Sequence, residues 1–217
     1  MKDWMIDRLT SFAEWEEQLV WMRVPLSPEQ ADGLPAGWRD ALTGERSAAQ
    51  RLAMLWGPLA DLLPRSFAAF SQHLCGLAML QTAQRPVSLV YAFANGEDDV
   101  AAARGFLPSP APPPILPVLA IDLAPLLSVH DGLVHFMSYD GGPLPSAEWM
   151  QAGNGVAGEP TLLKIAMDGS DAFGFDVSER PARAYHLSPP EDMVELVDDP
   201  WGHLDGLLVR LVPGSGS

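Results

Sequence analysis

The chain is poor in cysteine, in long apolar runs and in positive charge. Its 217 residues include one cysteine, Cys75, which excludes an internal disulfide framework and a zinc site built from several thiolates. No uncharged apolar run reaches the roughly 18–20 residues that a membrane-spanning helix needs. The first residues, MKDWMIDRL, carry acids where a secretory signal has a basic end and an apolar stretch. We therefore expect a cytoplasmic protein with no membrane partner.

The scarcity of positive charge limits the partners further. Thirteen Lys and Arg stand against 28 Asp and Glu, a formal net charge of −15 at pH 7. Phosphate binding needs clustered Lys and Arg, so nucleic acid is not an expected partner. Residues 110–217 hold most of the imbalance, with 4 basic and 15 acidic side chains. This charge either serves solubility or forms an acidic face that attracts a basic protein.

The chain is rich in apolar residues, and in residues 1–82 these recur at helical spacing. The 47% hydrophobic content suffices for a sizeable core and excludes a fully disordered chain. Ser11 and Glu14 have capping-box spacing, ahead of an apolar stripe that ends at Met22. Ser27 gives a second helix start. Further helical stretches are 34–42, 47–56 and the stripe of Phe67, Phe70, Leu74, Leu77 and Leu80. We expect residues 1–82 to be a helical region packed on the rest.

The pattern changes in residues 83–212. Residues 87–93 are rich in β-branched and aromatic side chains and predict a strand. Six prolines in residues 107–117 predict an extended crossing. Two apolar runs flanking Asp168–Asp171 predict a hairpin. The other predicted elements are helices at 121–129, 146–150 and 200–212, and strands at 133–137 and 182–187. We expect an α+β fold, with the helical region followed by a mixed or antiparallel sheet and flanking helices, and residues 213–217 as an appended linker.

Some residue types in the chain could serve catalysis. His130 and Asp131 are adjacent and followed by glycine, a pattern typical of a helix end, although it also allows a base with its carboxylate. His130 and His135 could bind a metal with Asp131 or Asp140, but no recognised metal motif is present. Cys75 lies in an apolar stripe, which predicts a small buried hydrophobe. We expect no cofactor and no enzymatic activity, with a small metal-dependent hydrolase as the third hypothesis.

Residues 85–212 resemble the SUKH superfamily, which includes a fungal cell-wall-assembly regulator and many bacterial immunity proteins. The resemblance rests on LPVLAIDL at 116–123, LLSVHDGL at 126–133, LKIAMDGSD at 163–171 and the closing helical region 191–211. It implies an α+β domain without catalysis that binds a toxin through a concave acidic surface. Such a fold-level analogy is an associational argument for function.

The first hypothesis is an immunity protein that neutralises a cognate toxin domain by occlusion through an acidic surface. Loops on a rigid sheet are where binding groups collect, and three predicted turns carry acids. The predicted partner-binding residues are Asp131, Tyr139, Asp140, Trp149, Asp168 and Asp171. The second hypothesis is a regulatory or scaffold binding module of the same fold with no toxin.

Overall fold

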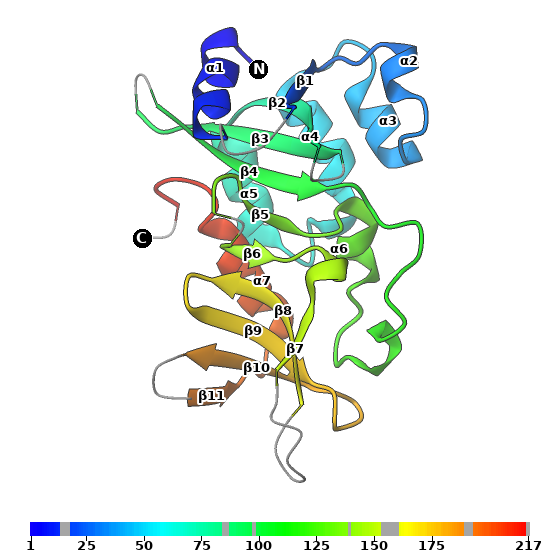
Figure 1. Cartoon of the computed structure of the whole chain (residues 1–217), viewed down its shortest axis with the longest axis vertical. Helices are drawn as coiled ribbons and strands as arrows, with labels where there is room; N and C mark the ends of the chain where they lie inside the picture. Colours follow the sequence, from blue (N-terminus) through cyan, green and yellow to red (C-terminus); the bar gives the residue numbers. More distant parts are fainter. Residues whose placement is uncertain are drawn as a thin grey trace.

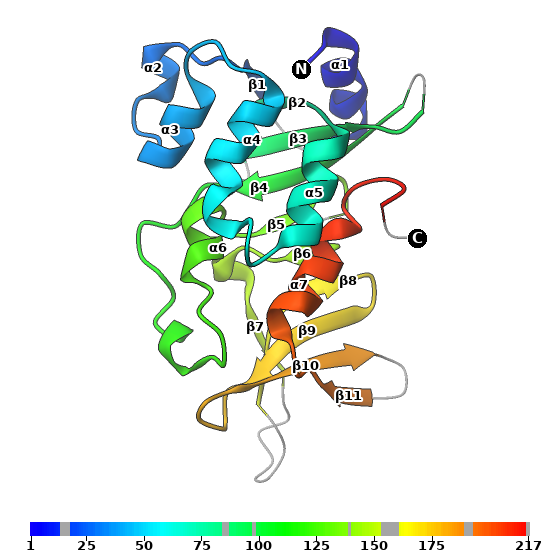
Figure 2. The same ribbon diagram turned by 180° about the vertical axis from the view of Figure 1, so that it is seen from behind.

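The computed structural model of the chain describes residues 1–13, 18–83, 87–96, 99–138, 140–152, 161–188 and 193–215. It contains helices and two antiparallel sheets, so the predicted α+β class is confirmed. The two sheets follow one another along the long axis of the molecule (Figure 1), and most helices lie on one face (Figure 2).

The first sheet combines strands from both predicted regions. Its order is β1 (Val20–Arg23), β2 (Leu74–Gln81), β3 (Ser88–Ala94), β4 (Val100–Phe106) and β5 (Leu133–His135), with every neighbouring pair antiparallel. The strand predicted at 87–93 is confirmed as β3. The boundary expected after residue 82 falls between β2 and β3, two neighbours in this sheet. Residues 1–82 therefore supply two strands as well as helices.

The prediction of a helix that runs to Leu80 is wrong, because the chain is helical only to His73 and β2 follows. Every residue from Gly76 to Leu80 is buried, so no polar alternation marks this strand. The register of β2 shifts between Leu74 and Gly76, which leaves Cys75 as an extra residue. Cys75 is exposed, so the prediction that it is buried is also wrong.

The second sheet spans residues 142–196. Its order is β11 (Met193–Leu196), β10 (Arg183–Ser188), β9 (Asp171–Asp176), β8 (Leu162–Asp168) and β6 (Gly142–Pro143), with β7 (Met150–Ala152) also paired to β8. The hairpin across Asp168–Asp171 is confirmed, and Gly169 takes a φ of 61° in its turn. Residues 193–196, expected within the closing helical region, form a strand instead.

Helices cover the sheets from two sides. In Figures 1 and 2, α1 (Asp3–Phe12) lies on one face of the first sheet, and the other long helices lie on the opposite face. The helices that follow α1 are α2 (Pro28–Ala31), α3 (Ala36–Leu42), α4 (Ala48–Trp56), α5 (Pro64–His73), α6 (Ala124–Val129) and α7 (Pro200–Val209). The 3-10 turns are η1 (Gly57–Leu59), η2 (Leu116–Val118) and η3 (Ser146–Glu148).

The helix starts show which local signals determined the structure. Ser27 begins α2 at the predicted helix start, and Ser47 begins α4 where the sequence predicts the helical stretch at 47–56. Each has a complete capping box. Ser11 does not begin a helix, because it lies inside α1. Its predicted partner Glu14 lies outside the described residues. The stripe that ends at Met22 reaches into β1, which pairs with β2.

Side chains on the two faces of β3 pack into two different hydrophobic cores. Tyr91 and Phe93 belong to the main core, which also contains Phe173 of the second sheet. Val90 and Ala92 face the other way and pack in the α1 cluster. The main core is therefore continuous between the two sheets.

The sheets meet where β5 and β6 lie side by side. The His135 backbone N–H donates to the Asp140 carbonyl at 2.7 Å in the turn between them. A Cβ atom at Gly142 would lie 2.2 Å from the carbonyl oxygen of Leu133, so only glycine allows this approach.

Candidate functional site

His130 belongs to a buried polar network. The indole N–H of Trp56 donates to the Tyr91 hydroxyl at 3.0 Å, and that hydroxyl lies 2.6 Å from His130 Nε2. His130 Nδ1 lies 3.4 Å from the Phe106 carbonyl, which assigns the proton of a neutral ring to Nδ1. Burial lowers the pKa of His130 to about 3. The ring has no exposed surface, so His130 is a core residue at the end of α6 and does not face a substrate.

Asp131 and Trp149 hold the segment that follows β6. The Asp131 carboxylate accepts hydrogen bonds from the backbone N–H of Ser146 at 2.8 Å and from its hydroxyl at 3.0 Å. The indole N–H of Trp149 donates to the Leu144 carbonyl at 3.0 Å, and the ring packs on the core. Both predicted binding residues therefore have intramolecular partners.

We expect Asp131→Ala to lower the free energy of unfolding by about 1–2 kcal/mol, because it leaves the Ser146 N–H without its acceptor. Urea unfolding measures this cost. Asp122→Ala is the matched control, since exposed Asp122 accepts one bond, from Ala124 N–H at 2.9 Å. If Asp131 serves only to bind a partner and does not shape this turn, Asp131→Ala should be as stable as the unchanged protein.

The other predicted acids lie at the opposite end of β5 and β6. Asp140 follows β5 and accepts from the Ser138 hydroxyl. Asp168 forms an ion pair with Arg210, just after α7. Asp171 lies 3.5 Å from His186 Nε2. Tyr139 lies outside the described residues. The prediction placed these acids and Asp131 on one surface, but the structure separates them into two groups.

His186 carries a serine and an aspartate beside its ring without the geometry of a catalytic triad. Ser188 Oγ lies 2.9 Å from His186 Nε2, and Asp171 contacts the same nitrogen. A triad needs the serine on one ring nitrogen and the carboxylate on the other. His203 lies beside His186, with ring centroids 5.2 Å apart, and burial is the main cause that lowers the pKa of His203. Within the described ranges, no group of three or more His, Cys, Asp or Glu side chains could hold a metal ion.

A groove of about 670 Å³ separates the start of α5 from the start of α7. Buried Asp205 of α7 lines this groove. Its carboxylate accepts hydrogen bonds from the backbone N–H groups of Arg65 at 3.0 Å and Ser66 at 2.7 Å, and so joins α7 to the start of α5. Its lining mixes apolar and charged side chains: Asp61, Leu62, Pro64, Arg65, Val197, Asp199, Trp201, Gly202, His203 and Asp205. Sequence reasoning missed this groove because its two walls are far apart in the chain.

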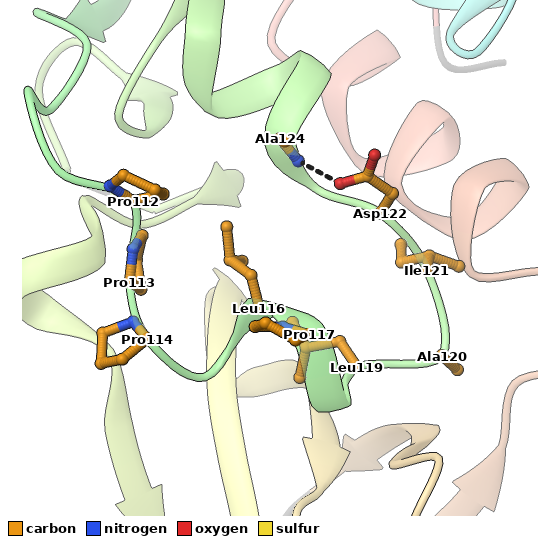
Figure 3. Close-up of a pocket in the computed structure, with 10 residues that line it drawn as sticks. All are labelled: Pro112, Pro113, Pro114, Leu116, Pro117, Leu119, Ala120, Ile121, Asp122 and Ala124. Atoms are coloured by element: carbon orange, nitrogen blue, oxygen red, sulfur yellow. Dashed lines mark hydrogen bonds between the residues drawn. The ribbon is translucent and has the colours of Figure 1, made fainter.

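The proline-rich crossing forms a second hollow, of about 490 Å³. Figure 3 shows its lining, which comes from one segment, residues 112–124. The predicted extended crossing is interrupted by η2, and Ala182 N–H anchors it by donating to the Val118 carbonyl at 2.8 Å. Asp122, the acid of this lining, accepts from Ala124 N–H (Figure 3). The hollow therefore offers an apolar contact surface without a set of converging polar groups.

The end strand of the second sheet presents a third feature. Val194 and Leu196 of β11 are 43% and 52% exposed. Glu195, Asp198 and Asp199 lie beside them and are also exposed. The excess of acids in residues 110–217 predicts an acidic surface, but the sequence does not predict a strand here. The strand makes this a mixed apolar and acidic edge, which we call the β11 edge (residues 194–199).

Comparison of the chain with protein-family models, with curated proteins and with solved structures finds no match. The SUKH resemblance of residues 85–212 thus stays a prediction. Within the described ranges, no helix combines the length and apolar character needed to cross a membrane.

Proposed function

We propose that this chain is an immunity protein that binds a toxin domain through an acidic surface and blocks it by occlusion. The observation that carries the proposal is the β11 edge. Its acids Glu195, Asp198 and Asp199 form no ion pair with any described residue, and two exposed aliphatic side chains adjoin them. Apolar contact area with charge at its margin is the composition of a protein interface.

Electrostatics supports a basic partner. Exposed like charges repel one another, and a cationic surface relieves that repulsion on binding. The nearest strand to β11 carries Arg183, but this side chain is already paired with Glu179 at 3.1 Å. Arg65 lines the groove beside Asp199, but the three acids of the β11 edge outnumber it, so the net charge at this edge is negative. Many toxin domains act on nucleic acid, and their substrate grooves are basic, which fits an acidic plug.

The test is protection. The protein encoded by the neighbouring reading frame is expressed in a host cell with and without this chain. Arrest of growth by the neighbour alone, together with rescue and co-purification when this chain is present, supports the proposal. A harmless neighbour, or a toxic one that this chain neither binds nor blocks, contradicts it.

We expect the double variant Glu195→Lys, Asp198→Lys to weaken toxin binding at least tenfold, or about 1.4 kcal/mol. The association rate should also fall as salt rises from about 50 to 500 mM, since screening shortens the reach of surface charge. Surface plasmon resonance measures both. The control is Asp32→Lys, Asp40→Lys, which changes the net charge equally on exposed positions near α2 and α3, at the far end of the molecule from β11 (Figure 1). Equal weakening by both double variants would show a general charge effect and remove the β11 edge from the interface.

A further inference from the structure

β11 leaves part of its backbone without a partner strand. In the described part of the chain it ends the second sheet, with β10 as its neighbour. The Val197 N–H donates to the Ala184 carbonyl at 2.9 Å. Backbone groups of an antiparallel strand alternate between its two sides, so Glu195 bonds to β10 and the N–H and C=O groups of Val194 and Leu196 point away from it. These groups can pair with an additional strand.

The two faces of this edge differ in chemistry. Val194 is paired with Leu187, and Leu196 with Tyr185, so these four side chains share the face that α7 does not cover. Glu195 is paired with His186, whose ring contacts His203 of α7, and so projects toward the helical face. A strand added here would meet aliphatic side chains on one face.

On its other face the same strand would meet Glu195. Asp198 and Asp199 follow the end of β11, and Asp199 lines the groove between α5 and α7 together with Asp61 and Arg65. Side chains of a strand alternate between its faces. The edge therefore matches a segment in which aliphatic residues alternate with Lys or Arg.

A second copy of this chain fits the edge poorly. Antiparallel pairing of two β11 strands through the outward groups of Val194 and Leu196 would place the two copies of Glu195 opposite one another, and like charges placed opposite one another are destabilising. Charged side chains on an edge strand also protect natural sheet edges from self-association. The same charge attracts a cationic segment.

We infer that β11 binds an extended segment of the toxin, in which aliphatic residues alternate with Lys or Arg, as an added strand. This inference rests on the proposed function, since it specifies how that partner is held. Main-chain bonds to Val194 and Leu196 supply affinity, and the alternating side chains supply specificity.

The test uses a fluorescein-labelled eleven-residue peptide in which lysine alternates with valine and threonine, and the full chain. Fluorescence anisotropy should show binding that a glutamate-for-lysine peptide lacks. Val194→Pro should weaken binding at least tenfold, because it removes an outward N–H without removing a bond to β10. Val194→Thr keeps that N–H and should change affinity less than threefold. Absence of binding, or equal affinity for the glutamate peptide, overturns the inference.

A measurement on the unchanged protein avoids dependence on the folding of the proline variant. Amide hydrogen exchange should slow at Val194 and Leu196 when the lysine peptide binds, because these N–H groups become hydrogen-bonded. Peptide binding without protection of these two amides overturns the added-strand geometry. Sedimentation analysis tests whether a second copy of this chain occupies the edge. If the unchanged protein forms a dimer and Val194→Pro abolishes it, the inference that a toxin segment binds there is overturned.

The protection assay separates this inference from the proposed function. If the unchanged chain rescues cells and a folded Val194→Pro chain rescues them equally well, the immunity function stands and the added strand is wrong. If the unchanged chain gives no rescue, the proposed function itself fails. Loss of rescue by Val194→Pro, with rescue kept by Val194→Thr, supports both.

Discussion

Asp205→Ala should lower the free energy of unfolding by about 3 kcal/mol. The Asp205 carboxylate is buried in α7 and accepts the backbone N–H groups of Arg65 and Ser66 and the Ser66 hydroxyl, at 3.0, 2.7 and 2.6 Å. These N–H groups open α5 and have no partner within that helix. Removing the acceptor leaves buried donors unsatisfied, and bonds to a charged group are worth more than neutral ones. Urea unfolding monitored by circular dichroism measures the loss.

Asp199→Ala is the matched control for this variant. Asp199 caps α7 through one bond, from the Gly202 N–H at 2.9 Å, and it is exposed. Loss of such a cap costs about 1 kcal/mol. Asp205→Asn keeps an oxygen acceptor and should fall between the two. If Asp205→Ala lowers the free energy of unfolding no more than Asp199→Ala does, the hydrogen bonds of Asp205 to the start of α5 do not stabilise the packing of α5 against α7.

This contact also illustrates what the sequence could not reveal. The predicted helix that ends the chain is correct in place, and Ser27 and Ser47 start helices at the predicted positions. These signals are local, since a capping box is complete within four residues. Asp205 and Ser66 are 139 positions apart, and nothing in either segment marks the other.

The errors in the strands have the same origin. Apolar spacing from Phe67 to Leu80 fits a helix, yet β2 follows His73. It pairs with β1 and β3, and the cores on the two sides of the sheet bury both of its faces. β11 lies within residues 191–211, which the SUKH resemblance predicts to be a closing helical region, but pairing with β10 makes it a strand. Tertiary pairing overrides local propensity at both places.

The candidate site was predictable in charge but not in geometry. The excess of acids in residues 110–217 predicts an acidic surface, and Glu195, Asp198 and Asp199 are exposed. The acids selected from turns have intramolecular partners that a sequence does not show, such as Ser146 for Asp131 and Arg210 for Asp168. Turn acids often shape the turn itself, which is why position in a loop did not identify the open surface.

Acid should destabilise this protein through His130, and removal of that ring should make stability less dependent on pH. Burial lowers the pKa of His130 from 6.5 to about 3. Between these values the unfolded chain binds a proton that the folded chain does not, so the free energy of unfolding falls by about 1.4 kcal/mol per pH unit as pH drops below 6.5. His130 alone therefore accounts for a loss of about 2 kcal/mol between pH 7.5 and pH 5.

The comparison of His130→Gln with Tyr91→Phe tests this contribution. Glutamine does not titrate, so the loss between pH 7.5 and pH 5 should be about 2 kcal/mol smaller in His130→Gln than in the unchanged protein. Tyr91→Phe removes the hydroxyl that faces His130 Nε2 but leaves the ring buried, so it should lower stability at both pH values and keep the steep dependence. His135 and His203, whose pKa values burial also lowers, are common to all three proteins and cancel in the differences. Urea midpoints and slopes at the two pH values give the result. An equally steep loss in His130→Gln would mean that the ring takes up its proton in the folded state, and would place His130 within reach of solvent instead of in the core.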